Sequence, residues 1–452
     1  MTKANAIIPQ HVLDMLKRIR RTFDRHASEK AADAQPPAVN SLRVVKSASR
    51  ETVDGLWRTL KVAGVPEDTP NQIADSRSLE QIERYNSNIE NFIGTIKVPV
   101  GVIGPVKIRG INALGDYLIP LATSEAALVA SYGRGALVAS KAGGINTAVL
   151  YEGVMRTPVF RFSHMINAGL FVEWVTEHID RLKAAAESTT RHGKLISLEP
   201  IIDANLVFLI CRYTTGDASG QNMVTLATHA LAEAIIAHCP VIIERWYIEA
   251  NYSGDKKASY LGMSTGRGRK VSAAVTLPAP LVQRYLGTTV EDMLAYGQVA
   301  NLGALLSGQF GAQAHYANGL AAFYIATGQD VACVSESAVG FTRMEARKED
   351  LFCSVTMPNI LVGSVGGGTQ LPSQAAALDI LGLRGAGKGA ALAEVTAALC
   401  LCGEISIVAA MAAGDFVQAH RSLARTRTST RTRTATRTKT GTGTSTTASA
   451  SA

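Results

Sequence analysis

Residues 158–249 carry the pattern that most restricts how this chain can fold. Strand-like segments of alternating apolar residues and segments of helical periodicity follow one another there. They are residues 159–162, 167–186, 195–202, 205–213, 221–238 and 241–248. The resulting order, β-α-β-β-α-β, is that of a ferredoxin-like domain. We therefore expect an α+β protein in which this small domain is inserted into a larger one.

The larger domain is expected to be helical and mixed, arranged around a long central helix. Residues 304–327 are apolar and rich in Ala and Gly, which favours one long helix in close contact with its neighbours. At 452 residues, the chain has room for two or three domains. The predicted division is an N-terminal helical region at 1–84, a larger domain in two parts at 85–157 and 250–420, the inserted domain at 158–249, and a tail at 421–452.

Charge and hydropathy argue against a nucleic-acid-binding protein and against a membrane-spanning protein. The formal net charge is +8, but seven basic residues and no acids follow His420, and removing seven from +8 leaves +1 for the body. The Arg/Thr-rich tail is expected to be disordered, with nonspecific contacts to anionic polymers at most, so nucleic acid is not an expected partner. The richest apolar run, residues 390–413, is interrupted by Glu394 and Glu404, which argues against a membrane span.

The termini and the cysteines favour a cytoplasmic protein without a metal. The N-terminus shows no signal-peptide pattern. The six cysteines show no paired metal spacing and lie in apolar segments, as reduced core thiols do. An amphipathic helix in residues 1–35, with Val12, Leu16, Ile19 and Phe23 on one face, is expected to pack on the body. A partner subunit or an anionic surface is the alternative.

Residues 253–257 are the first candidate for chemistry. They form an expected turn after a strand-like segment and present Lys256 and Lys257 beside the carboxylate of Asp255. A lysine held on a constrained turn can place its ammonium against a developing oxyanion. The alternative is a solvated charge cluster, because such triplets are usually found on the surface.

Two further candidates lie at helix starts. Glu125 is expected in the first turn of a buried helix, either as a complement to the helix dipole or as an acid with a raised pKa. The Gly/Asn-rich segment 216–222 opens a helix of the small domain, where free backbone N–H groups suit a phosphate. An ordinary capped turn is the alternative. The chain has no GxGxxG or P-loop motif.

His315, Asn318 and Asp330 belong to the expected central helix and its end. His315 and Asn318 share a face, although a lone histidine in such a helix is more often a satisfied core residue. Asp330 follows the helix C-terminus, where an anion is unfavourable. Local conflicts of that kind are more expected at functional sites than elsewhere.

These motifs, in this order, resemble the catalytic domain of the class I 3-hydroxy-3-methylglutaryl-CoA (HMG-CoA) reductases. The similar segments are residues 90–94 with 98–105, 122–131, 216–222, 255–257, 328–330 and 365–369, and the resemblance extends over roughly residues 90–420 without large gaps. The resemblance implies an NADPH-dependent oxidoreductase that converts HMG-CoA to mevalonate and CoA by two hydride transfers. That reaction belongs to the mevalonate route to isoprenoids.

The resemblance also implies roles for individual residues. Lys256 would stabilise the oxyanions, Glu125 would protonate the aldehyde oxygen, and His420 would protonate the departing CoA thiolate. Asp330 would hydrogen-bond and tune both Lys256 and Glu125. The other implied site residues are Arg156, Asn318, Asp255 and Lys257 for the substrate, and Asp217, Ser219, Gln221, Asn222 and Arg425 for the cofactor.

Domain roles and subunits follow from the same resemblance. The larger domain would bind the acyl-CoA substrate, and residues 158–249 would bind NADPH. Active sites would form between the subunits of a homodimer or tetramer. Glu125 and Lys256 would come from one subunit and Asp330 from its neighbour.

Several positions depart from the family pattern. Glu249 replaces a serine and Ala300 replaces a lysine, both of which the family uses to hold HMG; the others are Ser219, Gln221, Cys333 and Val334. Losing the lysine removes a charge-assisted hydrogen bond worth about 1.5–3 kcal/mol. Three functions therefore stay open: an HMG-CoA reductase, a reductase of another acyl-CoA thioester, and a non-catalytic paralogue used for binding or assembly.

Overall fold

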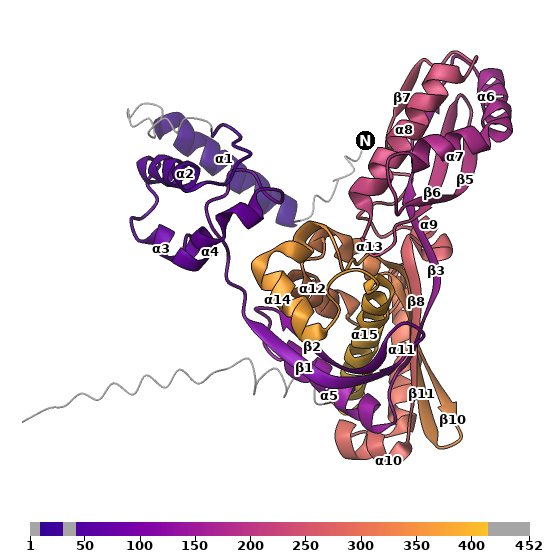
Figure 1. The fold of residues 1–452 in the computed structure, drawn as a ribbon. Helices are drawn as coiled ribbons and strands as arrows, with labels where there is room; N and C mark the ends of the chain where they lie inside the picture. The colour runs from indigo at the N-terminus through magenta and orange to yellow at the C-terminus, as the bar shows by residue number, and fades with distance from the viewer. Residues whose placement is uncertain (1–9, 30–41, 415–452) are drawn as a thin grey trace, which may run out of the picture. The chain divides into compact units, whose positions relative to one another are not determined.

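A computed structural model of the protein describes residues 10–29 and 42–414. The chain divides into two compact units, one ending at Lys97 and one beginning at Val98. Figure 1 shows the helices and strands of both. The predicted tail at 421–452 lies outside the described residues.

The N-terminal unit consists of short helices around a small apolar core. Its elements are α1 (Gln10–Glu29), α2 (Arg50–Val62), α3 (Thr69–Ile73), α4 (Ser76–Glu80) and the 3-10 helix η1 (Ile82–Tyr85). Val53 and Trp57 of α2 pack with Phe92 in this core. Leu16 and Phe23 on α1 are exposed, so packing of the α1 face on the body stays a prediction.

The second unit combines a β-ribbon, a large sheet and the helices around them. Its strands are β1 (Val100–Arg109), β2 (Leu114–Ala122), β3 (Asn146–Arg156), β4 (Val159–Arg161), β5 (Lys194–Asp203), β6 (Leu206–Thr214), β7 (Arg245–Tyr247), β8 (Gly268–Leu277), β9 (Gly311–Ala312), β10 (Gly340–Arg347) and β11 (Asp350–Ile360). Its helices are α5 (Leu128–Lys141), α6 (Met165–Glu177), α7 (Ile179–Glu187), α8 (Gln221–His238), α9 (Tyr260–Thr265), α10 (Ala279–Leu281), the π-helix η2 (Val282–Leu286), α11 (Val290–Ser307), α12 (Tyr316–Thr327), η3 (Val331–Cys333), α13 (Val334–Ser337), η4 (Gly367–Gln370), α14 (Pro372–Leu381) and α15 (Gly389–Ala412).

The large sheet runs in the order β7-β4-β6-β3-β8-β11-β10-β9, and β5 also pairs with β6. β3 joins its two halves, because residues 146–153 pair with β8 and residues 154–156 pair with β6. Along β8, buried side chains alternate with half-buried ones, the period of a strand with one face on the core. The chain is therefore a mixed α+β protein, as predicted, and Arg156 sits where β3 passes from one half of the sheet to the other.

Residues 159–247 contain four strands of this sheet with the helices α6, α7 and α8 (Figure 1). Their strand order is β7-β4-β6-β5. The single helix predicted at 167–186 is two helices that meet at His178. The ring nitrogen Nδ1 of His178 lies 2.8 Å from the Trp174 carbonyl oxygen, which also accepts the His178 N–H at 3.1 Å.

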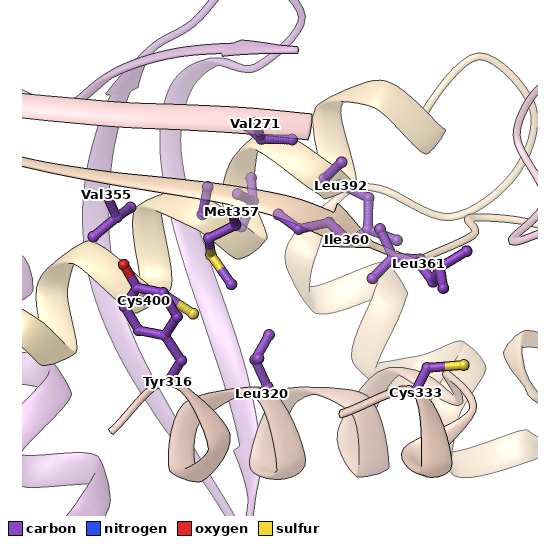
Figure 2. Close-up of a cluster of buried hydrophobic side chains, with 14 of the residues drawn as sticks. Val271, Tyr316, Leu320, Cys333, Val355, Met357, Ile360, Leu361, Leu392 and Cys400 are labelled. Atoms are coloured by element: carbon purple, nitrogen blue, oxygen red, sulfur yellow. The ribbon is translucent and has the colours of Figure 1, made fainter. Parts of the chain in front are cut away.

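The core of the second unit lies between the large sheet and the helices α12 and α15. α15 contacts β3, β8 and β11 on the sheet side and α5 and α12 on the helix side. Figure 2 shows Tyr316 and Leu320 of α12 facing Met357 of β11 and Cys400 of α15. α15 is apolar and long enough to cross a membrane, but 83% of its most apolar window is buried in the protein, as expected of a core helix.

The long central helix predicted at 304–327 does not form. α11 ends at Ser307, and Gly308 and Gly311 have φ angles of +71° and +88°. Glycine adopts these left-handed conformations without a steric penalty, and they end the helix. The chain then forms β9, and α12 begins at Tyr316. The long buried helix of this unit is α15 instead.

Candidate active site

Lys256 lies on a turn whose backbone is held by a separate segment. Its φ angle is +58°, which costs a non-glycine residue about 1–3 kcal/mol. The N–H of Lys256 donates to Oε1 of Glu336 at 3.1 Å. The Ser335 hydroxyl donates to the Lys256 carbonyl oxygen at 2.6 Å. Two residues of α13 therefore hold both peptide groups of Lys256 in place.

The Lys256 side chain pairs with Asp330. Its Nζ lies 2.8 Å from Oδ2 of Asp330, and the two side chains are 43% and 41% exposed. This hydrogen bond is the main cause that raises the pKa of Lys256. Lys256 therefore keeps its ammonium form to higher pH than an ordinary lysine.

Asp330 follows the C-terminus of α12, as the sequence suggests, but it also begins the next short helix. Its Oδ1 accepts the N–H of Ala332 at 3.0 Å, so Asp330 caps the N-terminus of η3, where an anion is favourable. Lys256 and Asp330 also lie in the same chain. This geometry corrects the expectation that Asp330 reaches Lys256 from a neighbouring subunit.

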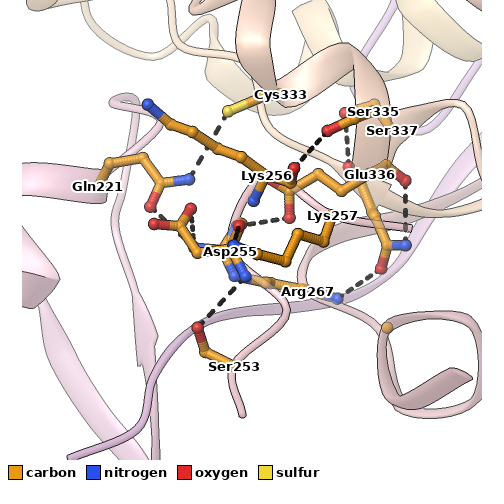
Figure 3. A network of polar contacts seen from close by, with 12 residues as sticks. Gln221, Ser253, Asp255, Lys256, Lys257, Arg267, Cys333, Ser335, Glu336 and Ser337 are labelled. Atoms are coloured by element: carbon orange, nitrogen blue, oxygen red, sulfur yellow. Dashed lines mark hydrogen bonds and ion pairs between the residues drawn. The ribbon is translucent and has the colours of Figure 1, made fainter. Parts of the chain in front are cut away.

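Arg267 and Glu336 form a buried ion pair next to the turn. Each residue is 1% exposed, and Nη1 of Arg267 lies 2.5 Å from Oε2 of Glu336. Nη2 of Arg267 donates to Oδ1 of Asp255 at 2.9 Å and to Oε1 of Gln221 at 2.8 Å (Figure 3). The sequence reasoning missed Arg267 and Glu336, because a pair this far apart in the chain has no spacing signal. The glycines on both sides of Arg267 were the only local sign of a constrained position.

Arg156, a substrate-binding candidate, is held by two carboxylates. Its Nη1 lies 3.1 Å from Oδ2 of Asp255 and 3.4 Å from Oε2 of Glu249. Burial raises the pKa of Asp255, but Arg267 and Arg156 outweigh burial, and the net pKa is lowered. Glu249 thus offsets part of the charge of Arg156. Lys257 turns back on its own loop, with Nζ donating to the Asp255 carbonyl oxygen at 2.8 Å.

Glu125 and Asn318 form a second pair. Nδ2 of Asn318 donates to both carboxylate oxygens of Glu125, at 3.1 and 2.9 Å. The prediction that Glu125 lies in the first turn of a helix is wrong, because α5 begins only at Leu128. Ala127 before it has a φ angle of +70°. Glu125 instead occupies an exposed turn, where its N–H donates to Oγ1 of Thr123 at 2.9 Å.

The two pairs lie at opposite ends of α12. Asn318 is in its first turn, and Asp330 follows its last residue, Thr327. At a rise of 1.5 Å per residue, the helix from Asn318 to Thr327 spans about 14 Å. One chain therefore does not bring Glu125 within hydrogen-bond distance of Lys256 and Asp330.

The segment predicted to bind a phosphate opens α8. Gly220 occupies the N-cap with a φ angle of +80°, and no side chain caps the first N–H groups of the helix. An uncapped helix N-terminus suits an anionic group. Ser219 is half-buried just before this glycine, and Gln221 and Asn222 begin the helix, with Asn222 exposed.

Asp217, a cofactor-binding candidate, is engaged at the start of α15. Its carboxylate accepts the N–H of Gly387 at 2.7 Å and that of Gly389 at 2.9 Å. Burial raises the pKa of Asp217, but these backbone donors outweigh it, and the net pKa is lowered. Asp217 therefore joins the helix-entry segment of α8 to the N-terminus of the core helix, a contact that the sequence did not indicate.

His315 has the surroundings of a core residue. Its Nδ1 lies 3.3 Å from Oε1 of Glu404, a carboxylate that is 1% exposed and also accepts the His315 N–H. Its ring stacks on Tyr132. Ala300, where the resembling family has a lysine, lines a cavity of about 290 Å³ formed by residues of α11, β10 and α15.

His420 and Arg425 lie outside the described residues, so their roles stay predictions. All six cysteines are free thiols, and burial raises the pKa of Cys333, which stands near Gln221. Within residues 10–29 and 42–414, no group of three or more His, Cys, Asp or Glu residues is arranged to hold a metal ion.

Comparisons with known proteins identify the family of this chain. A sequence model of the hydroxymethylglutaryl-coenzyme A reductase family matches residues 57–425. The 3-hydroxy-3-methylglutaryl-coenzyme A reductase of Methanothermobacter thermautotrophicus is 41% identical over 350 residues, which cover 77% of this chain and 88% of that protein. The enzyme of the same name from Haloferax volcanii is 41% identical over 349 residues, which cover 76% and 86%.

A solved structure shares the fold. The class II 3-hydroxy-3-methylglutaryl-CoA reductase from Streptococcus pneumoniae, bound to NADPH in open conformations, aligns with a TM-score of 0.59 at 19% identity. The alignment covers 81% of this chain and 98% of that one. The family model and these relatives define an oxidoreductase, and its architecture is mixed α+β. The chain belongs to the hydroxymethylglutaryl-coenzyme A reductase family, which confirms the resemblance seen in its motifs.

Proposed function

We propose that this protein reduces HMG-CoA to mevalonate and free CoA, at the expense of two NADPH and two protons. The first hydride would convert the thioester to a thiohemiacetal, which releases CoA and leaves an aldehyde. The second hydride would convert the aldehyde to the alcohol. One observation carries the proposal: Lys256, in the family's Asp-Lys-Lys motif, is fixed in an unusual backbone conformation with its ammonium on Asp330.

Lys256 would act on the reacting oxygen in both steps. A fixed ammonium in a partly desolvated site stabilises the negative charge that hydride addition places on the carbonyl oxygen. Asp330 holds the ammonium in place and keeps it protonated. Glu125 would supply the proton for the aldehyde oxygen, and His420 would supply the proton for the departing thiolate. Arg156 and Asn318 would contact the acyl group.

The separation of Glu125 from Lys256 supports an active site shared between two subunits. In this arrangement, one subunit provides Lys256 and Asp330, and its partner provides Glu125 and Asn318. Isologous contacts in a homodimer would complete two such sites at once. A dimer is the smallest assembly with this property, and a tetramer would contain it twice.

The cofactor-binding role belongs to the small domain in this proposal. We infer that residues 158–249 form a ferredoxin-like unit, which the strand order β7-β4-β6-β5 supports. The uncapped N-terminus of α8 suits a phosphate of NADPH. Ser219 and Asn222 would contact the cofactor, and NADPH would supply the hydrides. The free cysteines suit the reducing cytoplasm, where mevalonate would feed isoprenoid synthesis.

The direct test is NADPH oxidation by the full-length protein, measured with and without HMG-CoA. The proposal expects oxidation that depends on HMG-CoA and releases two NADP⁺ and one free thiol per HMG-CoA consumed. NADPH oxidation that is independent of HMG-CoA, or none at saturating HMG-CoA, would contradict it.

A second candidate is the reduction of an acyl-CoA without the distal carboxylate. The Arg156–Glu249 ion pair favours it, because an internal carboxylate already occupies a cation expected to serve the acyl group. A panel of acyl-CoAs separates the two, since the second candidate requires a neutral acyl group to be reduced faster than HMG-CoA. Under the first, Glu249→Ser would lower KM for HMG-CoA by about tenfold, the effect of one charge-assisted hydrogen bond.

A further inference from the structure

Stability alone does not explain the buried ion pair of Arg267 and Glu336. Burying two charges costs several kcal/mol per ion, and apolar residues of similar volume are often as good. The charged atoms of this pair also reach beyond each other. They also hydrogen-bond Lys256 and Asp255 of the turn and Gln221 at the start of α8.

Glu336 acts on the backbone of Lys256. One carboxylate oxygen binds Arg267, and the other accepts the Lys256 N–H at 3.1 Å. Ser335, next to Glu336, holds the Lys256 carbonyl oxygen at 2.6 Å. A left-handed conformation at a lysine persists only when surrounding groups enforce it. These two contacts on either side of one residue supply that enforcement.

Arg267 extends the same contacts to the proposed cofactor segment. One of its nitrogens, Nη2, donates both to Asp255 and to Gln221. Asp255 precedes Lys256, and Gln221 is the first residue of α8. Gln221 replaces a methionine of the family pattern, and a methionine offers no comparable acceptor. The link from α8 to the turn is therefore a property of this chain.

We propose that Glu336 and Arg267 are positioning residues that set the geometry of Lys256, and that Gln221 couples this geometry to the N-terminus of α8. The inference rests on the proposed reductase function. Neither residue touches the reacting atoms. Glu336 acts through the N–H of Lys256, and Arg267 acts through the carboxylates of Glu336 and Asp255.

The kinetic test compares Glu336→Gln and Ser335→Ala with the native enzyme. A catalytic group displaced by about 1 Å loses about 100-fold in rate, so kcat should fall by about that factor in Glu336→Gln and by about 3- to 10-fold in Ser335→Ala. KM for HMG-CoA should change less than about 3-fold. Ser335 is exposed, so its variant stays informative if loss of the buried charge prevents Glu336→Gln from folding.

Glu394→Gln is the matched control. Glu394 is another fully buried carboxylate, and its partners Asn112, Ala113 and Thr147 lie outside the turn. It should lose stability but keep kcat. A purely structural role for Glu336 predicts that all three variants keep kcat in the folded fraction, and that result would overturn the proposal.

Hydrogen exchange of residues 251–258 gives a readout that does not depend on turnover. Glu336→Gln and Ser335→Ala should raise exchange in this peptide. NADPH should lower it in the native protein, and Gln221→Met should remove most of that protection. Unchanged exchange in folded Glu336→Gln and in Ser335→Ala would refute the positioning role even if the enzyme is active. A native protein without turnover would instead refute the proposed function.

Discussion

The Lys256 turn rests on two charged residues that are each 1% exposed, whereas Glu125 stands on an exposed turn with Asn318 as its side-chain partner. Lys256 and Glu125 are both proposed to act in one reaction. The backbone of Lys256 is held by Glu336 and Ser335, and its side chain is held by Asp330. Among the described residues, the carboxylate of Glu125 is held by the side-chain amide of Asn318.

This difference shows which part of the proposed active site is complete in a single chain: the part around Lys256, not the part around Glu125. The backbone of Lys256 is held by the buried Glu336 of its own chain, where the low dielectric strengthens the contact. In the proposed dimer, Glu125 would gain further surroundings from the partner subunit. The contrast predicts strong effects at the Lys256 half, weak effects on folding at the Glu125 half, and dependence of Glu125 on the second subunit.

Removing the ammonium should have the largest effect on turnover. Lys256→Ala is expected to lower kcat by about 1,000-fold, the upper range for loss of one group that stabilises an oxyanion. The melting temperature should change little, because the side chain is 43% exposed. A variant that retains more than a tenth of native kcat would show that Lys256 is not the group that stabilises the oxyanion.

Stability should separate the two halves most clearly. Glu336→Ala removes the buried carboxylate that pairs with Nη1 of Arg267, leaves Asp255 as the remaining acidic partner, and should reduce the free energy of unfolding by about 3–5 kcal/mol. Glu125→Ala removes an exposed carboxylate and should change it by less than about 0.5 kcal/mol. Both would be measured by urea denaturation of purified protein. Equal losses of unfolding free energy in Glu336→Ala and Glu125→Ala would contradict this difference between the two positions.

The alkaline limb of the pH–rate profile should report the Lys256–Asp330 pair. The pair raises the pKa of Lys256, so activity is present below that raised pKa and is lost as pH rises through it. Asp330→Asn removes the carboxylate that raises the pKa of Lys256, so the alkaline limb should move to lower pH. A profile that does not move would mean that another group titrates there.

The smallest expected effect is that of Asn318→Ala. It frees the carboxylate of Glu125 without touching a buried contact, so we expect kcat to fall by about 3- to 10-fold, the value of one hydrogen bond. The pH profile should keep its alkaline limb, because Lys256 is unaffected. Asn318→Asp is the companion variant. It places a second carboxylate beside Glu125 and should lower kcat further.

Short-range patterns predicted much of this fold. The alternating apolar residues of β5 and β6 and the helical period of α8 give elements within one or two residues of those expected. These segments follow rules of local periodicity. The break between α11 and α12 was missed, because Ala- and Gly-rich sequence looks helical throughout. Only the left-handed φ angles of Gly308 and Gly311 reveal the turn.

The sequence motifs proposed a set of site residues but not their geometry. The motifs identified Lys256, Asp330 and Glu125, yet their chain positions did not say which two would meet. Arg267 and Glu336 were invisible as a pair, because long-range burial leaves no mark on either residue's neighbours in sequence. Asp217 shows the converse, a recognised motif residue whose carboxylate is occupied by Gly387 and Gly389.

The shared active site can be tested by mixing two inactive variants. Lys256→Ala and Glu125→Gln would be dissociated together, or co-expressed with different tags, and HMG-CoA-dependent NADPH oxidation measured in the isolated mixed dimer. If each site takes Lys256 from one subunit and Glu125 from the other, the mixed dimer regains one intact site, about half of native activity. If both residues serve the same site within one chain, the mixed dimer has no intact site. Activity no higher than that of the two parent variants would then contradict the account.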